Sequence, residues 1–364
     1  MHRLSHVKQR LTEKAFQLGF SHIGIASSQP VPHFQSFKRW IDAGYHAGMH
    51  YLAREDTLAK RADPGLILEG CQRVICLAMP YNFPLSPHNA KNPGFGRISA
   101  YAFTKDYHLI IAEKLQQLED FLINQVDKDV LVKSYVDTGP VLERGFAAQA
   151  GLGIPGKNGN LIIPRLGSYI FLAVMLTDLA LPIDTPFNRD VCGSCRRCIE
   201  ACPTGCIQSD RTIDASRCIS YLTIENKEII PDPLKRNLGD WLFGCDICQM
   251  VCPHNSRLQA QISPLGKPDL PEWLGLKEIL TWSKNNFRLK TEGTALNRAK
   301  LRGLVRNAVV IIGNQSETTM LPLLKKRLTN EADPIIRDAL HWAIEQIVSK
   351  NSENDQSYDR NTNL

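Results

Sequence analysis

The chain has 364 residues, 43% of them hydrophobic, and a formal net charge of +6. This length allows two or three domains with cores of their own. No apolar run approaches the roughly 20 residues that span a bilayer, and residues 1–5 open no apolar signal segment. We therefore expect a cytoplasmic protein with no membrane partner and no disulfide framework.

The positive charge is concentrated in one late segment. Residues 281–327 contain ten basic side chains against two acidic ones, which exceeds the surplus of the whole chain. Such a concentration favours a polyanionic partner such as nucleic acid, and a solvated helix face is the ordinary alternative.

The first part of the chain, to about residue 187, mixes helical and strand patterns. Apolar spacing predicts an initial helix over residues 4–18. Further helices are predicted at 107–125 and 143–150, and strands at 22–26, 73–79, 130–136 and 169–176. Because short strands alternate with helices, residues 1–187 are expected to form an α/β or α+β domain.

Eight of the eleven cysteines lie between residues 192 and 252. The first run reads Cys-x2-Cys-x2-Cys-x3-Cys-Pro, which is the bacterial ferredoxin pattern, in which three thiolates hold one 4Fe-4S cluster and the fourth reaches a second. Residues 188–256 are therefore predicted to form a ferredoxin-like domain with two 4Fe-4S clusters. Reciprocity assigns Cys192, Cys195, Cys198 and Cys252 to one cluster, and Cys202, Cys218, Cys245 and Cys248 to the other.

Structural zinc is the main alternative for these cysteines, since eight thiolates could hold two zinc ions. The Cys-Pro endings and the triple spacing of the first run argue against zinc. Three cysteines remain outside the pattern. Cys71 and Cys76 bracket an apolar strand and are expected to be buried thiols, while Cys206 is expected to be a bystander.

Helical patterns dominate beyond the cysteines. An apolar stripe runs from Leu301 to Ile312 and ends at Gly313, and further helices are predicted at 321–328 and 335–348. Stacked antiparallel helices of the HEAT type fit residues 271–350. The polar residues 351–364 are expected to be a disordered tail.

The densest polar segment of the first domain surrounds Asp137. A predicted strand ends at this aspartate, and a helix begins near Glu143. An aspartate at the carboxyl end of a strand in an α/β sheet points into the crevice where ligands bind. Burial beside Glu143 would raise the pKa of Asp137 and let it keep a proton near neutrality. An Asx turn or helix cap is an equal alternative.

Residues 151–160 are glycine-rich and carry one lysine, but they match no phosphate or dinucleotide fingerprint. Backbone approach to a cofactor and a plain hairpin explain the glycines about equally. The Asp-x-His-x-x-Gly pattern of many cobalamin proteins is also incomplete: Asp106 and His108 begin it, but Ile111 occupies the glycine position. A corrinoid bound here would lack a protein histidine on cobalt.

Beyond these motifs, the chain resembles the epoxyqueuosine reductase family. The Asp-Thr-Gly-Pro-x-Leu-Glu-Arg stretch that begins at Asp137 is the most specific match, together with the basic helical tail after the cysteines. One departure stands at residues 154–155, where the family commonly has tryptophan and an aliphatic residue. The other matching stretches are 44–52, 61–64, 153–158, 167–172, 220–225 and 306–308, besides the eight cysteines.

The resemblance implies reduction of epoxyqueuosine to queuosine at the wobble position of tRNA anticodons. Electrons from an external low-potential donor would pass through two 4Fe-4S clusters to cobalamin, and Asp137 would donate a proton. The chain would act as a monomer. The implied cobalamin contacts are Arg61, Tyr101, Asp137, Lys157, Asn158, Ser168, Ser220 and Leu222. The expected tRNA contacts are Arg298, Lys300, Arg302 and Arg306.

Two other functions compete with this interpretation. A reductive dehalogenase also combines cobalamin with two clusters, but it typically carries a twin-arginine export signal, and residues 1–10 contain none. An electron-transfer protein whose first domain only docks a partner is the alternative from another class. Iron and cobalt content would separate the three.

Overall fold

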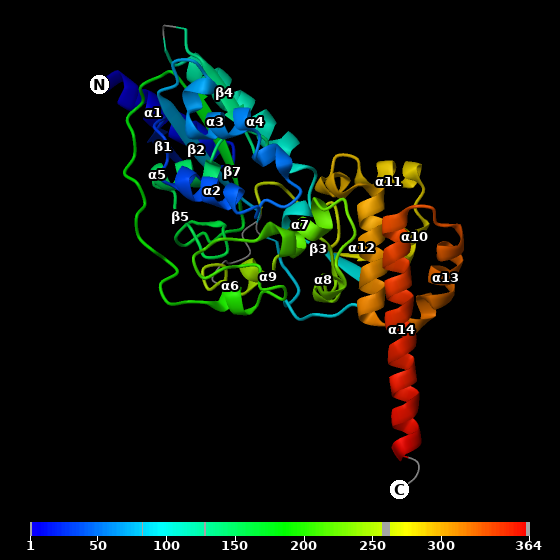
Figure 1. The fold of residues 1–364 in the computed structure, drawn as a ribbon. Coiled ribbons are helices and arrows are strands. Elements are labelled where there is room, and N and C mark those ends of the chain that lie inside the picture. Colours follow the sequence, from blue (N-terminus) through cyan, green and yellow to red (C-terminus); the bar gives the residue numbers. More distant parts are fainter. Residues whose placement is uncertain (1, 82, 127–128, 257–262, 362–364) are drawn as a thin grey trace. The chain divides into compact units, whose positions relative to one another are not determined.

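The computed structural model describes residues 2–81, 83–126, 129–256 and 263–361 (Figure 1). The chain divides into two compact units. The sheet unit comprises Met1–Pro84, Thr104–Ala215 and Ile247–Asp269, and the helical unit comprises Leu85–Phe103, Ser216–Asp246 and Leu270–Leu364. No helix among the described residues is long and apolar enough to cross a membrane.

The sheet unit is built on four strands in the order β1-β2-β7-β4, and every neighbouring pair is antiparallel. All four predicted strands are present, so the mixed helix and sheet prediction is confirmed. The antiparallel pairing makes this unit α+β, so the crevice expected at the carboxyl ends of parallel strands does not apply to Asp137. The strands are β1 (His22–Ser27), β2 (Arg73–Pro80), β4 (Val132–Tyr135) and β7 (Ile170–Thr177).

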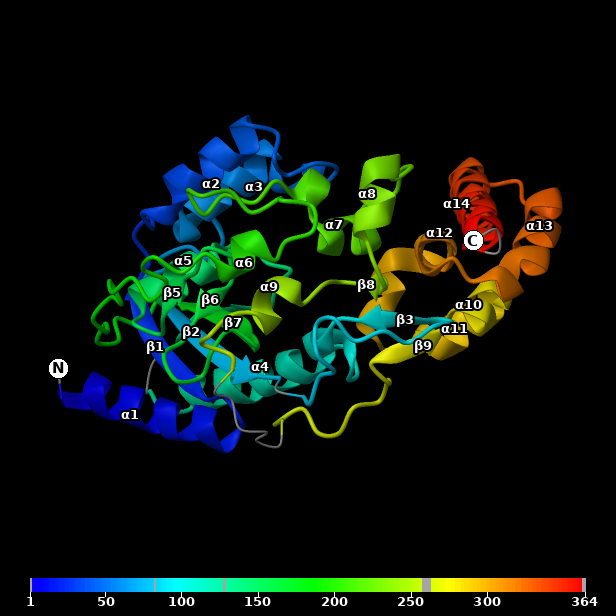
Figure 2. The same cartoon turned by 90° about the horizontal axis from the view of Figure 1, so that it is seen from below.

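Helices cover both faces of this sheet (Figure 2). Helices α1 (His2–Gln17) and α4 (Tyr107–Ile123) lie on one face, and α5 (Glu143–Gln149) packs on the other. The six central residues of β2 are consequently buried on both sides, which explains its unbroken apolar sequence. Phe146 of α5 is 1% exposed and packs in the core on the second face.

Shorter elements complete the sheet unit. The glycine-rich segment folds as the hairpin β5 (Ile154–Pro155) and β6 (Leu161–Ile162). A side chain at Gly153 would meet the Ile162 carbonyl oxygen at 2.3 Å, so close strand approach accounts for this glycine. The other elements are α2 (His33–Asp42), η1 (His50–Leu52), α3 (Glu55–Ala62), η2 (Pro64–Leu66), α6 (Arg197–Glu200) and α9 (Ile247–Met250).

The helical unit contains a small sheet in the order β8-β3-β9. Strand β3 (Phe95–Ile98) pairs in parallel with β8 (Trp241–Phe243) and antiparallel with β9 (Trp273–Gly275). Residues 85–103, which we had assigned to the first domain, therefore belong to this unit. Its other elements before the last helices are η3 (Ala100–Ala102), α7 (Ile219–Ile224), α8 (Asp232–Asn237), α10 (Leu276–Thr281), α11 (Lys284–Thr291) and η5 (Ala295–Ala299).

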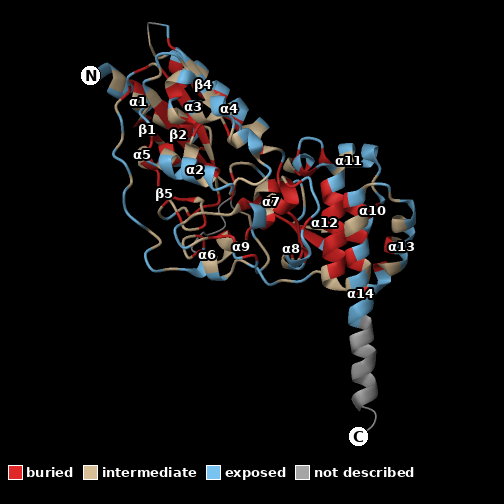
Figure 3. Ribbon diagram, in the orientation of Figure 1, coloured by how far each residue is buried: buried red, intermediate tan, exposed pale blue. Residues whose placement is uncertain are grey.

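Three predicted helices close the chain: α12 (Lys300–Gln315), α13 (Leu321–Asn330) and α14 (Pro334–Asn361), with η6 (Thr318–Met320) between the first two. Figure 3 shows α12 buried along most of its length. A side chain at Gly313 would meet the Trp342 ring at 2.7 Å, so this glycine lets α12 and α14 approach closely.

Helix α14 continues past residue 350, where a disordered tail was predicted, and ends at Asn361. Once its packed first half has nucleated the helix, each further residue forms a hydrogen bond that offsets its loss of backbone entropy. Residues 362–364 lie outside the described residues.

Candidate active site and cluster ligands

Asp137 follows β4 in an unusual backbone conformation. Its φ of +59° lies in the left-handed region, where residues other than glycine are uncommon. Its backbone N–H donates to the Glu143 carboxylate at 2.8 Å, which ties the loop to the first turn of α5. The Asp137 side chain is 66% exposed. A strained backbone that presents an accessible acid is typical of functional sites.

The start of α4 supplies two partners for the Asp137 carboxylate. The Tyr107 hydroxyl donates to Asp137 at 2.8 Å, and Nε2 of His108 lies 3.6 Å from the same oxygen. The other imidazole nitrogen of His108 lies 2.6 Å from the Asp106 carboxylate, which also caps α4 by accepting from the His108 backbone N–H. The Tyr107 ring stacks between His108 and Phe171 of β7, with centroid distances of 4.0 and 4.1 Å.

These contacts determine the charges at the site. Burial alone would lower the pKa of His108, but its hydrogen bond to Asp106 and its contact with the Asp137 carboxylate outweigh burial and raise the pKa to about 9. The contact with His108, followed by the hydrogen bond from Tyr107, lowers the pKa of Asp137. At neutral pH the site therefore holds an imidazolium between two carboxylates.

The group that keeps a proton near neutrality is Glu143. Burial, and then the charge of Asp137, raise the pKa of Glu143 to about 8. The predicted rise in the pKa of Asp137 is thus wrong, because its cationic and hydroxyl partners favour the charged form. The alternative, in which Asp137 forms an Asx turn or caps a helix, is also not observed. Its carboxylate instead contacts Tyr107 at the start of α4, 30 residues earlier in the chain.

Arg61, a predicted cobalamin contact, lies in the last turn of α3 and is 8% exposed. Among the described residues, its Nη1 has no hydrogen-bond partner. Burial lowers the pKa of Arg61, and the Phe37 ring lies 5.5 Å from its guanidinium. A buried guanidinium nitrogen calls for an acceptor, so this position fits a bound group rich in carbonyl or phosphate oxygens.

The other predicted contacts in the sheet unit join its core to the cysteine segments. Lys157 donates to the carbonyl oxygens of Gly193 and Cys195 at 2.7 and 2.9 Å. Asn158 is 4% exposed and donates to the Cys248 carbonyl at 3.4 Å. The buried Ser168 is held by side chains from the second cysteine run, with contacts to Gln249 and Asn255. The lysine ammonium is therefore committed to the first cysteine loop.

The remaining three lie in the helical unit. The Tyr101 ring is tilted against Phe243 at 6.0 Å. Leu222 of α7 is 2% exposed, and its carbonyl accepts a hydrogen bond from Arg306. The carbonyl of Ser220 accepts from the Thr223 hydroxyl at 3.3 Å.

One predicted set of cluster ligands gathers within the sheet unit. The pKa of Cys198 is raised by burial and then by its neighbours Cys192 and Cys252. Burial also raises the pKa of Cys252, with further contributions from Cys192 and Cys195. The proline-adjacent cysteine of the second run thus lies beside the first run, as reciprocal ligation requires. No three His, Cys, Asp or Glu side chains in the described ranges converge as they would on a single metal ion.

The second set is divided between the units, with Cys202 and Cys248 in one and Cys218 and Cys245 in the other. Their common cluster stays a prediction. The Cys206 sulfur lies 3.5 Å from that of Cys202 and is the main cause of a Cys202 pKa lowered to about 5. Cys206 is therefore in contact with a predicted ligand and is not a distant bystander.

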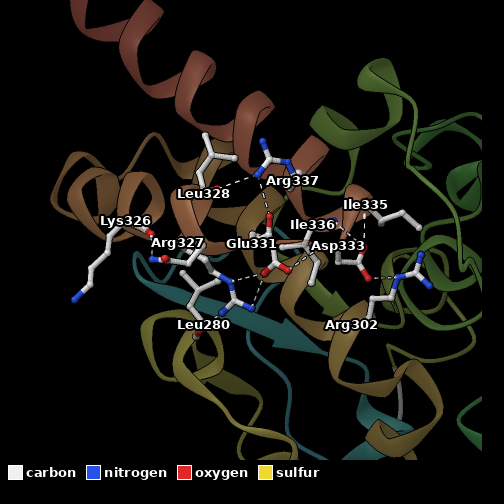
Figure 4. A network of polar contacts seen from close by, with 11 residues as sticks. Leu280, Arg302, Lys326, Arg327, Leu328, Glu331, Asp333, Ile335, Ile336 and Arg337 are labelled. Atoms are coloured by element: carbon white, nitrogen blue, oxygen red, sulfur yellow. Dashed lines mark hydrogen bonds and ion pairs between the residues drawn. The ribbon is translucent and has the colours of Figure 1, made fainter.

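The basic residues of the helical unit are less available than their sequence suggests. Arg298 pairs with Glu225 at 2.6 Å, and Arg302 pairs with Asp333 at 3.0 Å (Figure 4). Lys300 donates to the Asn297 side chain at 3.3 Å. Figure 4 also shows Asp333 capping α14 through the backbone N–H of Ile335.

Arg306 is 2% exposed, and the prediction that it contacts RNA is wrong. Its guanidinium donates to the carbonyl oxygens of Leu222, Asn226 and Glu228 and to the Asn307 side chain. These contacts tie α12 to α7 and to the residues that follow it. A stabilising role replaces the predicted phosphate contact.

Sequence reasoning missed Tyr107 and His108 as partners of Asp137. The available signal was Asp-x-His at the start of a predicted helix, which we examined only as an incomplete cobalamin pattern. Nothing local to that helix indicates that it meets a loop 30 residues later in the chain.

Comparison with known families agrees with the cysteine pattern. Residues 191–255 match the family model of the 4Fe-4S double cluster binding domain. This domain match, together with the acid, imidazolium and tyrosine that meet at the Asp137 loop, places the chain among the iron–sulfur oxidoreductases. Residues 61–138, which include Asp137, match the model described as "Epoxyqueuosine reductase QueG, DUF1730".

The relatives specify the family. The chain is 36% identical to epoxyqueuosine reductase of Escherichia coli strain K12 over 358 residues, which cover 95% of this chain and 91% of that protein. The corresponding protein of Cyclobacterium marinum is 38% identical and covers 82% of this chain and 94% of its own length. This chain belongs to the epoxyqueuosine reductase family.

Two solved structures are similar over almost the whole chain. One is an epoxyqueuosine reductase with a tRNA-Tyr epoxyqueuosine-modified stem loop, with a TM-score of 0.87 and 31% identity, covering 94% of this chain and 91% of that one. The other, from Bacillus subtilis, has its catalytic aspartate loop swung out of the active site, with a TM-score of 0.86, 31% identity and the same coverage.

Proposed function

We propose that this chain reduces the epoxide of epoxyqueuosine, at the wobble position of a tRNA anticodon, to the cyclopentene of queuosine. Family membership and the stem loop bound to a similar structure support this substrate. A tRNA substrate would place the enzyme in the cytoplasm. A single chain carries every predicted part of the site, so a monomer suffices.

The reaction removes one oxygen as water and needs two electrons and two protons. We propose that an external low-potential donor delivers the electrons singly through the two 4Fe-4S clusters. Bound cobalamin would supply the final reductant, since reduced cobalt is a strong donor toward a strained carbon–oxygen bond. Arg61 and Asn158, with Tyr101, Ser168, Ser220 and Leu222, are the residues proposed to hold it. The partnerless Nη1 of Arg61 supports such a group.

Asp137 is the proposed proton donor to the epoxide oxygen. Its accessible carboxylate and left-handed backbone support this role, as does the mobile catalytic aspartate loop of the similar structure. The Tyr107 hydroxyl and the His108 imidazolium orient this carboxylate and hold protons beside it.

The domain roles follow from this proposal. Residues 1–187 would hold the corrinoid, 188–256 the two clusters, and a HEAT-like region at 271–350 the tRNA. Unpaired anticodon bases can be splayed out, and the modified base has to leave its stack to react. Arg298, Lys300 and Arg302 are the proposed phosphate contacts, and the two arginines would exchange their carboxylate partners for phosphates.

The observation that carries the function is the accessible Asp137 site in a chain that matches the 4Fe-4S double cluster binding domain. The test uses full-length protein purified without oxygen, supplied with cobalamin, a low-potential reductant and tRNA containing epoxyqueuosine. Nucleoside mass spectrometry should show queuosine, and metal analysis should show about eight irons per chain. A preparation with eight irons that binds no cobalamin would remove the corrinoid from the proposal. A cobalamin-loaded preparation that forms no queuosine would refute the function.

A matched pair of variants tests the cluster assignment. Cys252→Ser should lose one cluster and leave about four irons, whereas Cys71→Ser should keep about eight. Equal iron in both variants would show that Cys252 is not a ligand.

A further inference from the structure

Three side chains lie in a line: Asp106 and His108 at the start of α4, and then Asp137, the proposed proton donor. Asp106 contacts one nitrogen of His108 at 2.6 Å, and the opposite nitrogen lies 3.6 Å from Asp137. The His108 side chain is 31% exposed, so it can exchange protons with solvent. A carboxylate on the far nitrogen fixes the imidazole tautomer and orientation, an arrangement that assists proton transfer in many enzymes.

The proposed reaction gives this line a task. The first proton converts the epoxide oxygen to a hydroxyl when one carbon–oxygen bond breaks. The second proton converts that hydroxyl to water when the other bond breaks and the double bond forms. The low-potential donor supplies two electrons in the same turnover. Both protons go to the same oxygen, whereas a carboxylic acid carries only one.

We propose that His108 is a proton relay that loads the Asp137 carboxylate for each of the two proton transfers, while the substrate remains bound. The proton on Nε2 passes to the Asp137 carboxylate, and the neutral imidazole then recovers a proton from solvent while Asp106 holds its other N–H. His108 thus acts through Asp137 and does not itself touch the substrate. This inference rests on the proposed function, because it assigns the two protons of that reaction.

The other groups around Asp137 are less suited to this task. Tyr107 donates to the same carboxylate, but it is only 8% exposed, so it is screened from the solvent that must return the proton. Glu143 faces the backbone N–H of Asp137 and not its carboxylate. Arg144 adds positive charge near Asp137, and a guanidinium does not release its proton. Asp106 and Asp137 are the charged groups that act on His108 itself.

The 3.6 Å separation is longer than a hydrogen bond, and the backbone explains how it can close. Asp137 sits in a left-handed conformation on a loop held by one backbone contact to Glu143. Catalytic hydrogen bonds in proteins without substrate are often long and tighten in the complex. A small shift of this loop brings the carboxylate to His108 for loading.

The kinetic test compares His108→Gln with His6→Gln, an exposed histidine on α1. Glutamine keeps a hydrogen-bonding side chain but cannot titrate. With cobalamin and tRNA bound normally, His108→Gln should lower kcat by about tenfold to a hundredfold with little change in KM for tRNA. The rate of the wild type should fall above about pH 9, where His108 loses its proton, and this limb should vanish in the variant. Added imidazole should restore part of the lost rate.

A second measurement does not depend on activity. In 15N-histidine NMR, His108 should titrate near pH 9, and Asp106→Asn and Asp137→Asn should each lower that pKa. A wild-type kcat and pH profile in His108→Gln would overturn the relay. So would a His108 pKa that neither aspartate variant changes, even if His108→Gln fails to fold. Absence of queuosine with the wild type, beside a normal His108 titration, would refute the proposed function and separate the two failures.

Discussion

Two regions of the molecule concentrate charge and use it in different ways. At the Asp137 site, charged groups are partly exposed. Contacts with Asp106 and Asp137 raise the pKa of His108 to about 9, whereas burial, and then the charge of Asp137, raise the pKa of Glu143 to about 8. On α12, by contrast, Arg306 is buried on carbonyl oxygens and Arg302 is paired with Asp333. Charge is thus partly accessible at the Asp137 site in the sheet unit, whereas much of it stabilises the fold in the helical unit.

The largest expected effect is the loss of stability when Arg306 is removed. Arg306→Met would remove the guanidinium donor from the buried carbonyl oxygens of Leu222 and Asn226, and each unsatisfied group costs about 1–3 kcal/mol. We expect the free energy of unfolding to fall by about 3 kcal/mol or more in urea titrations. Arg302→Met removes only a half-exposed ion pair and should cost less than about 1 kcal/mol. If the two variants lost the same free energy of unfolding, the distinction between the buried Arg306 and the partly exposed Arg302 would not hold.

A smaller effect is expected on tRNA binding. Arg298→Ala combined with Arg302→Ala should weaken stem-loop binding and reduce the slope of log affinity against log salt by about 1.5, as two lost phosphate contacts require. The fold should be unaffected. Arg3→Ala with Arg10→Ala on α1 removes the same charge and is the matched control. The prediction fails if both double variants bind the stem loop with the same affinity and salt slope.

A separate expected effect concerns Glu143 and the pH dependence of stability. The folded state keeps the Glu143 proton up to about pH 8, whereas the unfolded chain releases it near 4.5. The folded state therefore binds more protons between these values, and its stability should fall as the pH rises through this window. Glu143→Gln keeps an acceptor for the backbone N–H of Asp137 but cannot ionise. Between pH 5 and pH 8, which lie inside the window set by the two pKa values, the Tm of this variant should therefore fall less than that of the wild type. Parallel Tm curves for the two proteins would show that Glu143 ionises normally.

Much of the fold could be predicted because its signals are local. The apolar runs of β1, β2 and β7 and the helical spacing of α4 and α12 identified these elements to within a few residues. Antiparallel pairing could not be read in the same way, since register depends on partners far along the chain. The short β3 was missed because its four residues gain their stability from β8 and β9.

The candidate site shows the same limit. Asp137 and the cysteine runs stand out in the sequence because their residue types and spacing carry chemistry. The role of Arg306 was misjudged because charge alone does not reveal burial. Tyr107 and His108 acquire their meaning only when α4 meets the Asp137 loop in the folded chain.

The most direct test of the account is turnover by Asp137→Asn beside Asp42→Asn, an exposed aspartate on α2. Conversion of epoxyqueuosine to queuosine in a tRNA stem loop would be followed with cobalamin-loaded, iron-replete protein. The account predicts that Asp137→Asn loses about a hundredfold or more in kcat while it still binds cobalamin, and that Asp42→Asn retains wild-type turnover. Wild-type turnover by Asp137→Asn would contradict the account and return this aspartate to a structural role.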